Sequence, residues 1–218
     1  MNITMRFSLI IFLILLVSLN SCNDNSVNPY RGTQFYPINI GNRWEYKAAG
    51  YDSLGNLEYE GNFSESFTEF IVLDNQPVYQ IQSPLYHSPA CCQYKFFFQN
   101  NNDGVHFLTY YLGWIYNNLV YKYPCSENDF FISGNHNDTT FVISINDTVN
   151  CDAGKFECIV YKNITKDFSD TTFIKILGYS YTYVAKAVGK VKFESYWSNS
   201  IGIFYKSNEY SLTNYTFK

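Results

Sequence analysis

The sequence predicts an all-β fold: a curved antiparallel sheet, an open barrel or a sandwich, with at most one short helix. Aromatic residues make up 20% of the 218-residue chain, with 21 Tyr and 19 Phe, and aromatic side chains fit the pleated, half-buried surface of a strand. Short alternating segments recur about every ten residues between Asn, Asp, Gly and Pro, which is typical of an antiparallel sandwich or barrel. Sustained helical periodicity is missing, and a single turn over 183–187 is the one helical candidate.

The elements follow from the alternation of apolar and polar residues, which places successive side chains on opposite faces of a strand. This pattern predicts strands over 43–49, 58–73, 78–82, 94–99, 105–111, 119–123, 140–145, 156–165, 173–179, 189–196 and 201–205.

Two hairpin turns stand out. Residues 100–104 read Asn-Asn-Asn-Asp-Gly between two aromatic runs, and Asn117-Asn118 separates two more. Asn, Asp and Gly tolerate the positive φ angles that tight hairpin turns require. We therefore expect a hairpin at each position.

The first predicted strand alternates charged and aromatic residues, so Trp44 and Tyr46 share one face. Two functions are open for these rings: core anchors of the first strand, or a platform on which a ligand stacks. We favour the core, because large aromatic side chains dominate the energetics of protein interiors.

The N-terminus has the pattern of an export signal. Arg6 precedes the apolar run 7–17, and Ser18 and Asn20 interrupt the hydrophobicity. A bilayer-spanning helix needs about 20 apolar residues, so this run fits the central region of a signal peptide better. We assign 1–21 to the signal peptide.

The end of that run, Leu19-Asn20-Ser21-Cys22, resembles the lipobox of bacterial lipoproteins, and the Asn and Asp that follow resemble lipoproteins of the Bacteroidetes. The resemblance implies cleavage before Cys22, a thioether-linked diacylglycerol on its sulfur, and fatty acyl chains such as palmitate that hold the chain on a membrane. It also implies a bacterial cell-envelope location, on the periplasmic face of the outer membrane or at the cell surface. The alternative is an ordinary signal peptide followed by a coincidental cysteine.

Residues 22–33 continue from the lipidated cysteine as a tether. They are polar, rich in Asn, and contain Pro29 and Gly32, so they cannot bury enough apolar surface to fold. A flexible chain of this length spans about 20 Å. We expect the remainder, 34–218, to form a single β-rich domain.

Charge and motifs exclude several functions. The net charge is −4 and only 16% of residues are charged, which leaves no basic patch for nucleic acid. The nucleophile elbow, zinc-protease, phosphate-loop and Ser-x-x-Lys motifs are all missing. We expect no enzyme, although an envelope hydrolase with paired carboxylates or a Ser and His remains an alternative.

Cysteine usage predicts disulfides, because an exported chain meets an oxidising compartment. Besides Cys22 the chain contains Cys91, Cys92, Cys125, Cys151 and Cys158. An odd number indicates two bridges and one free thiol. Adjacent cysteines strain a mutual bridge, so we expect Cys92, or its neighbour, to pair with Cys125, and Cys151 to pair with Cys158 across a turn.

A metal site is the competing interpretation of the cysteines. Their spacing matches no zinc pattern, and His87, His106 and His136 are scattered. We therefore expect neither a metal nor another cofactor.

Asp-Ser/Thr triplets resemble the O-glycosylation acceptor pattern of Bacteroidetes, which implies sugars on Ser53, Thr139, Thr148 and Thr171. The alternative is coincidence, because turns favour Asp, Ser and Thr.

Three segments carry a wider resemblance: YPINIGNRWEY at 36–46, AGKF at 153–156 and VGKVK at 188–192. In this order they resemble a group of uncharacterised bacterial lipoproteins with a DUF3108-like, or TapB-like, domain. The resemblance implies an envelope β domain and brings neither an established activity nor catalytic residues. Where many members have Val-Pro before the Ala-Gly, this chain has Cys151-Asp152.

These observations lead to a membrane-anchored domain that acts by binding or assembly. An aromatic-lined concavity suits an acyl chain or another apolar ligand. The alternative is a glycan-binding module in which exposed Trp114, Tyr116 and Trp197 stack on sugar rings.

Overall fold

The structure is a computed structural model that describes residues 34–86, 94–133, 138–167, 175–199 and 201–218. Gln34–Lys218 forms one compact unit, and its described part is all-β, as predicted. A search of the described residues for a helix both long and apolar enough to cross a membrane found none.

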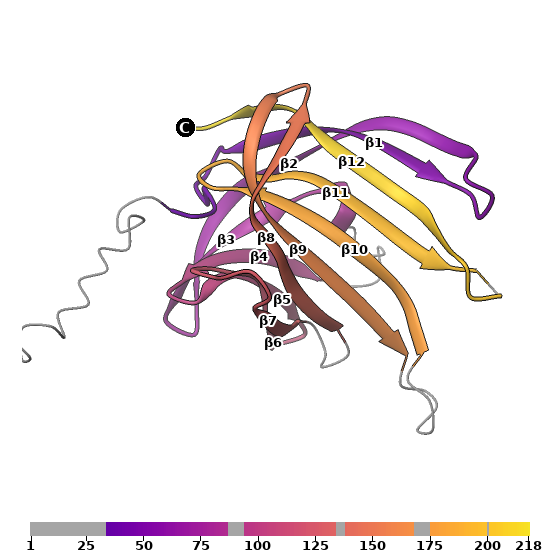
Figure 1. Ribbon diagram of the computed structural model, residues 1–218. Coiled ribbons are helices and arrows are strands. Elements are labelled where there is room, and N and C mark those ends of the chain that lie inside the picture. Colours follow the sequence, from indigo (N-terminus) through magenta and orange to yellow (C-terminus); the bar gives the residue numbers. More distant parts are fainter. Residues whose placement is uncertain (1–33, 87–93, 134–137, 168–174, 200) are drawn as a thin grey trace, which may run out of the picture. The chain divides into compact units, whose positions relative to one another are not determined.

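The sheet contains twelve strands, all paired antiparallel, in the order β6-β5-β4-β3-β2-β1-β12-β11-β10-β9-β8-β7 (Figure 1). One 3₁₀ helix, η1, follows β3. The bounds are β1 Arg43–Tyr51, β2 Leu57–Leu73, β3 Gln76–Gln82, η1 Pro84–Tyr86, β4 Lys95–Asn101, β5 Gly104–Tyr111, β6 Trp114–Lys122, β7 Phe130–Ser133, β8 Asp138–Cys151, β9 Gly154–Asp167, β10 Lys175–Ala185, β11 Gly189–Ser198 and β12 Phe204–Thr216.

The pairing of β1 with β12 makes the first and last strands neighbours. The two edges of the sheet are therefore β6 and β7, which follow each other in the chain. A meander that curls in this way gives an almost closed, barrel-like sheet with an inner and an outer face (Figure 1).

The turn predicted at 100–104 is confirmed, because Asn101 pairs with Gly104 and Gly104 has a φ of 142°. The turn predicted at Asn117-Asn118 is wrong: both residues lie inside β6 and pair with β5. The chain reverses instead at Leu112-Gly113, where both residues have positive φ, and Gly113 supplies that conformation at little cost.

The helical turn predicted over 183–187 is also wrong. β10 continues to Ala185, where it still pairs with Gly189 of β11. The chain then turns at Ala187, which has a φ of 59°. Pairing on both sides of β10 outweighs the weak local preference for a helical turn.

One end of the barrel is closed by the residues that precede β1. Phe35, Tyr36 and Ile38 are buried there. The Phe35 ring stacks on Tyr123 at 4.2 Å, and the Phe35 carbonyl accepts a hydrogen bond from the Ala187 backbone. The chain therefore enters the domain at a plugged end.

Trp44 and Tyr46 are core anchors, as predicted, with exposed fractions of 1% and 0%. The Trp44 indole donates to the Val188 carbonyl at 2.6 Å, and the Tyr46 hydroxyl donates to the Lys190 carbonyl at 2.9 Å. The two rings thus fix β1 to the start of β11 inside the barrel.

The opposite end carries the β1–β2 and β11–β12 turns and the start of β10, on the right in Figure 1. The inner face toward this end is where the cavity described next lies.

Candidate functional site

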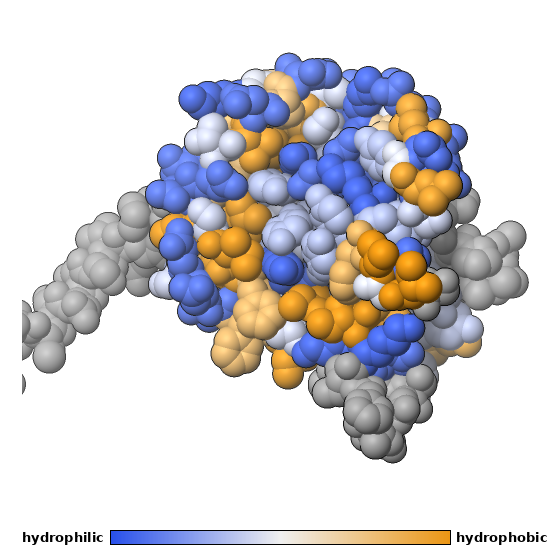
Figure 2. Space-filling view, turned by 45° about the vertical axis from the view of Figure 1, so that its right-hand side comes forward, coloured by the Kyte–Doolittle hydropathy of each residue, from blue (hydrophilic) through white to orange (hydrophobic). Residues whose placement is uncertain are grey.

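A cavity of about 690 Å³ opens at this end of the inner face. Ligand pockets of small molecules span roughly 300–1,000 Å³. Figure 2 turns this side forward: weakly polar side chains occupy the middle of the face, and hydrophobic ones gather around them. The lining residues come from β1, β2, η1 and β9–β12: Ala48, Tyr59, Gly61, Asn62, Phe63, Pro84, Leu85, Tyr86, Thr165, Gly178, Tyr179, Ser180, Phe193, Ser195, Tyr196, Trp197, Asn208, Glu209 and Tyr210.

Aromatic rings form the deep part of the cavity. Phe193 stacks on Tyr210 at 4.8 Å between ring centroids, and Phe63 meets Tyr210 edge-on at 5.3 Å. Tyr86 of η1 completes the group from the other side. These rings offer an apolar ligand a surface that already excludes water.

Small side chains create the space above these rings. Ala48 and Gly61 face each other in the β1–β2 ladder, and Ser195 lies on β11. Strand alternation puts Gly61 on the same face as Tyr59 and Phe63. A Cβ added at Gly61 would meet no heavy atom within 4 Å, so this glycine leaves open volume.

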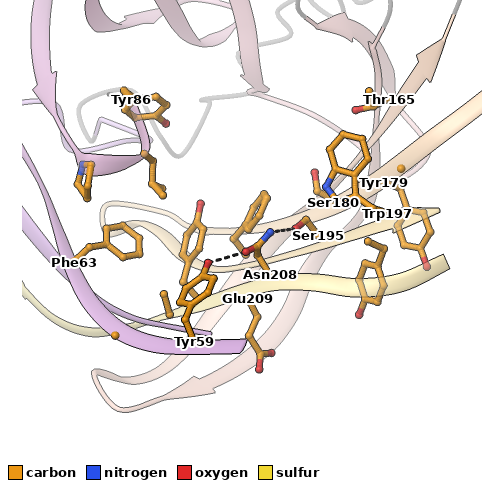
Figure 3. A pocket seen from close by; sticks show the side chains of 18 of the residues that line it. Tyr59, Phe63, Tyr86, Thr165, Tyr179, Ser180, Ser195, Trp197, Asn208 and Glu209 are labelled. Carbon is orange, nitrogen blue, oxygen red and sulfur yellow. Dashed lines mark hydrogen bonds between the residues drawn. The ribbon is translucent and has the colours of Figure 1, made fainter. Parts of the chain in front are cut away.

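Polar groups line one wall of the outer part. The Tyr59 hydroxyl donates to Asn208 Oδ1 at 2.7 Å, and Asn208 Nδ2 lies 3.4 Å from Ser195 Oγ (Figure 3). Ser180 also lines the cavity, and its hydroxyl makes no hydrogen bond with the described residues. The wall therefore contains polar groups that already bond to each other, such as Tyr59 and Asn208, and one hydroxyl, that of Ser180, that can bond to a ligand.

Apolar side chains form the rim. Leu85, Tyr59 and Trp197 line the cavity with exposed fractions of 48%, 52% and 43%. Apolar surface that stays exposed beside a cavity is typical of a binding site.

A buried ion pair lies beneath the aromatic floor. Lys190 Nζ is 3.1 Å from Glu65 Oε1, with side-chain exposures of 5% and 1%. The ammonium also lies 4.9 Å from the centre of the Tyr210 ring, and the Ser83 hydroxyl donates to the same carboxylate oxygen. Burial alone lowers the pKa of Lys190, but the facing Glu65 carboxylate together with the phenols of Tyr210, Tyr86 and Tyr46 outweighs it, and the net pKa is raised.

Burial raises the pKa of Tyr210 and Tyr86. Their phenols stay neutral at physiological pH, so the floor of the cavity carries no charge of its own.

The structure separates the aromatic residues predicted to contact a ligand. Trp197 lines the cavity, whereas Trp114 and Tyr116 lie on the edge strand β6, exposed at 70% and 49% and outside the cavity. Phe63, Phe193 and Asn208 were not predicted as ligand contacts. They line the cavity because of the strands that lie beside them, and these neighbours are known only once the strand register is known.

The predicted Cys151–Cys158 disulfide is not formed in the structure. Within the described residues Cys125, Cys151 and Cys158 are free thiols. The β8–β9 register places Cys158 opposite Asp147 and Cys151 opposite Gly154, so the two cysteines do not face each other. Burial raises the pKa of Cys158 to about 12.

The predicted Cys92–Cys125 disulfide cannot be located, because Cys92, like Cys91, lies outside the described residues. Cys125 itself is a free thiol whose sulfur lies 4.0 Å from the Tyr161 hydroxyl.

The predicted glycosylation sites differ in their surroundings. Ser53 and Thr148 are exposed, on the β1–β2 turn and on β8, whereas Thr139 is half-buried and accepts a hydrogen bond from Lys166 Nζ at 3.0 Å. Thr171 lies outside the described residues.

Chemistry for hydrolysis does not converge on the cavity. Glu209 is the one carboxylate among the described residues that line it, and it is engaged by the Tyr51 hydroxyl and by Lys206. His106 of β5, the one histidine among the described residues, contacts Asp103 in the β4–β5 turn and Asn117 on β6, away from the cavity. Within the described ranges there is also no group of three potential metal ligands.

Comparison with protein-family models gave no match, and comparison with curated protein sequences gave none either. Two crystal structures are similar in fold. One, from Bacteroides fragilis, is described as an exported protein with a YmcC-like fold; it shares 14% identity over 85% of this chain and 100% of that chain, with a TM-score of 0.48. The other, from Parabacteroides distasonis, is described as a lipoprotein; it shares 16% identity over 84% of this chain and 99% of that chain, with a TM-score of 0.42.

Proposed function

We propose that the protein is a lipid-anchored binding protein of the bacterial cell envelope that holds an apolar ligand in the cavity at the open end of its barrel. The observation that carries this proposal is the 690 Å³ cavity with its aromatic floor and small polar wall. The lipobox-like Leu19-Asn20-Ser21-Cys22 and the DUF3108-like segments support the envelope location.

The floor explains the preference for an apolar ligand. Each methylene removed from water contributes about 0.8 kcal/mol, so about ten methylenes against Phe63, Phe193 and Tyr210 supply roughly 8 kcal/mol before the cost of association. An acyl chain of that length is therefore sufficient for measurable binding.

The cavity opens at only one of the two ends of the barrel, because the other end is closed by Phe35 and its neighbours. Phe35 lies at the closed end, where the described chain begins, and the cavity opens at the other. The mouth of the cavity therefore lies at the opposite end of the domain from Phe35.

A glycan ligand is the second candidate, favoured by one observation. The half-exposed Trp197 ring lies at the rim beside Ser195, and aromatic rings beside polar groups suit a sugar ring. In this case the sugar binds at the rim and leaves the aromatic floor empty.

The test is native mass spectrometry of the full-length chain, purified from the membranes of the cells that produce it. We expect a co-purified, organic-extractable molecule on the native chain and its loss from the Gly61→Phe variant, whose ring occupies the open space above the aromatic floor. The matched control is Gly61→Ala, which makes the same backbone change but leaves most of the volume free.

Absence of such a molecule from both the native chain and the Gly61→Ala variant would overturn the proposal. Binding that survives Gly61→Phe but is lost in Trp197→Ala would indicate the glycan alternative.

A further inference from the structure

We propose that the cavity selects an amphiphile with a neutral, hydroxyl-bearing head group, such as a monoacylglycerol, over one with an anionic head group. This inference rests on the proposed binding of an apolar ligand and adds the chemical class of its polar end.

The described lining of the cavity carries one negative charge and no positive charge. Among the described residues that line the cavity there is no lysine, arginine or histidine, and the single charged side chain is Glu209. Lys206 and Tyr51 already hold its carboxylate. A second anion at the mouth meets this carboxylate and no lining cation.

The second argument concerns the nearest buried cation. Lys190 lies under the floor, packed against the ring of Tyr210, and is not part of the lining. Its charge is compensated by Glu65 at 3.1 Å. An anionic head group that reached it would have to displace the aromatic floor and compete with a buried carboxylate, which is costly because both charges lose their solvation.

The third argument is the supply of neutral hydrogen-bonding groups. Asn208 Nδ2 makes only long contacts, 3.3 Å to Ser207 Oγ and 3.4 Å to Ser195 Oγ, so it can donate to a ligand oxygen in their place while Oδ1 keeps the hydrogen bond from Tyr59. The Ser180 hydroxyl lines the same cavity from β10. Both groups serve the hydroxyls of a glyceryl head group as donors and as acceptors.

The arrangement of these groups gives the ligand an orientation. Tyr210 in the floor is only 8% exposed, whereas Tyr59 and Trp197 at the rim are 52% and 43% exposed, and Asn208 bonds to Tyr59 (Figure 3). The hydrocarbon chain enters first, and the head group stays at the polar wall.

The test uses two ligands with the same ten-carbon chain, brominated in the half of the chain next to the head group so that the bromine lies near the rim: the monoglyceride and the free carboxylate. The full-length chain in phosphatidylcholine nanodiscs carries Trp114→Phe, which removes an exposed indole outside the cavity and leaves two indoles. Trp197 at the rim is the reporter, and the fluorescence of the buried Trp44 is measured separately in Trp114→Phe/Trp197→Phe and subtracted. Bromine quenching of Trp197 gives the two dissociation constants at pH 7.4, and Gly61→Phe gives the signal of ligand dissolved in the lipid.

We expect the monoglyceride to bind at least tenfold more tightly than the carboxylate. The double variant Ser180→Ala/Asn208→Ala should reduce this preference to less than threefold, mainly by weakening the monoglyceride. Val191→Ala is the matched control for a core substitution outside the cavity and should keep the preference.

Equal binding of the two ligands, or tighter binding of the carboxylate, would overturn the head-group inference and leave the apolar site in place. Quenching no greater than in Gly61→Phe for either ligand would overturn both the inference and the proposed function.

Discussion

Lys190 and Glu65 form an ion pair in the middle of the barrel, with Nζ and Oε1 3.1 Å apart. Glu65 belongs to β2, and Lys190 is the second residue of β11. The Lys190 ammonium also faces the rings of Tyr46 and Tyr210. The pair therefore joins the two sides of the barrel directly beneath the cavity floor.

Loss of one member of this pair should be more harmful than loss of both. Lys190→Met leaves the Glu65 carboxylate buried without its cation, which costs about 3–5 kcal/mol in the free energy of unfolding. Glu65→Gln/Lys190→Met removes both charges and keeps an oxygen for the Ser83 hydroxyl. Guanidinium unfolding should find this double variant at least about 2 kcal/mol more stable than Lys190→Met. Equal stability of the two variants would show that the buried charge is not the cause.

A second prediction concerns Gly50, which lies under the ring of Tyr59. A Cβ at Gly50 would overlap that ring, so Gly50→Ala should push Tyr59 aside and break its hydrogen bond to Asn208. We expect a loss of about 1 kcal/mol in the free energy of unfolding.

The same substitution in a Tyr59→Ala background is the control. Without the ring the added methyl group fits, and alanine restricts the unfolded chain, so Gly50→Ala should then be neutral or stabilise by about 0.4–1 kcal/mol. An equal loss in both backgrounds, measured by urea unfolding, contradicts the role of the ring contact.

Most strands could be predicted because the alternation that marks them is local, but β7 and the larger part of β12 were missed. Alternation placed Trp44 and Tyr46 on one inward face, and both are buried. It failed at Asn117-Asn118 because a turn residue does not force a turn. There both asparagines keep their pairs on β5, and Gly113 provides the reversal.

The cavity could not be predicted because it depends on register between distant strands. Ala48 of β1 pairs with Tyr210 of β12 and with Gly61 of β2, and no local pattern encodes these pairs. The β11–β12 register also shifts between Ser195 and Tyr196, where β12 contains one extra residue, Ser207, and such a bulge changes the face on which the β12 side chains lie on its two sides. Trp197 was identified as a ligand-contacting candidate from its residue type, without its place at the rim.

A third prediction is a loss of stability in acid that depends on Lys206. This ammonium lies 2.8 Å from Glu194 and 2.9 Å from Glu209. Burial alone raises the pKa of each carboxyl group, but for Glu194 the neighbouring lysines, and for Glu209 the hydrogen bonds from Tyr51 and Lys206, outweigh it and lower the pKa.

Because the folded pKa values are lowered, the stabilisation is present above the unfolded value, about 4.3 for Glu, and is lost as the pH falls through the folded values. Urea unfolding from pH 7 to pH 3 should show this loss, of about 1 kcal/mol for such a network. Lys206→Met should flatten this part of the curve.

The control is Lys95→Met, which removes one charge from an exposed lysine that forms no ion pair with the described residues and should leave the curve unchanged. If this control flattens the curve as well, the effect is due to net charge and not to the Lys206 contacts.

The last prediction tests the state of Cys158. Its thiol is buried and its pKa is about 12, so at pH 8 only about one thiol in ten thousand is the reactive thiolate. Iodoacetamide at pH 8 should therefore leave Cys158 unmodified in the native chain and modify it in guanidinium.

Trypsin releases this cysteine alone in the peptide 156–162, because Lys155 and Lys162 flank it. Mass spectrometry without reduction should find that peptide unlinked. Further cleavage before aspartates separates Cys151, in the peptide 147–151, from Cys125. A cross-link of Cys158 to the peptide 147–151 would mean that the β8–β9 hairpin shifts its register in the oxidised protein, since the present register keeps Cys151 and Cys158 out of opposite positions.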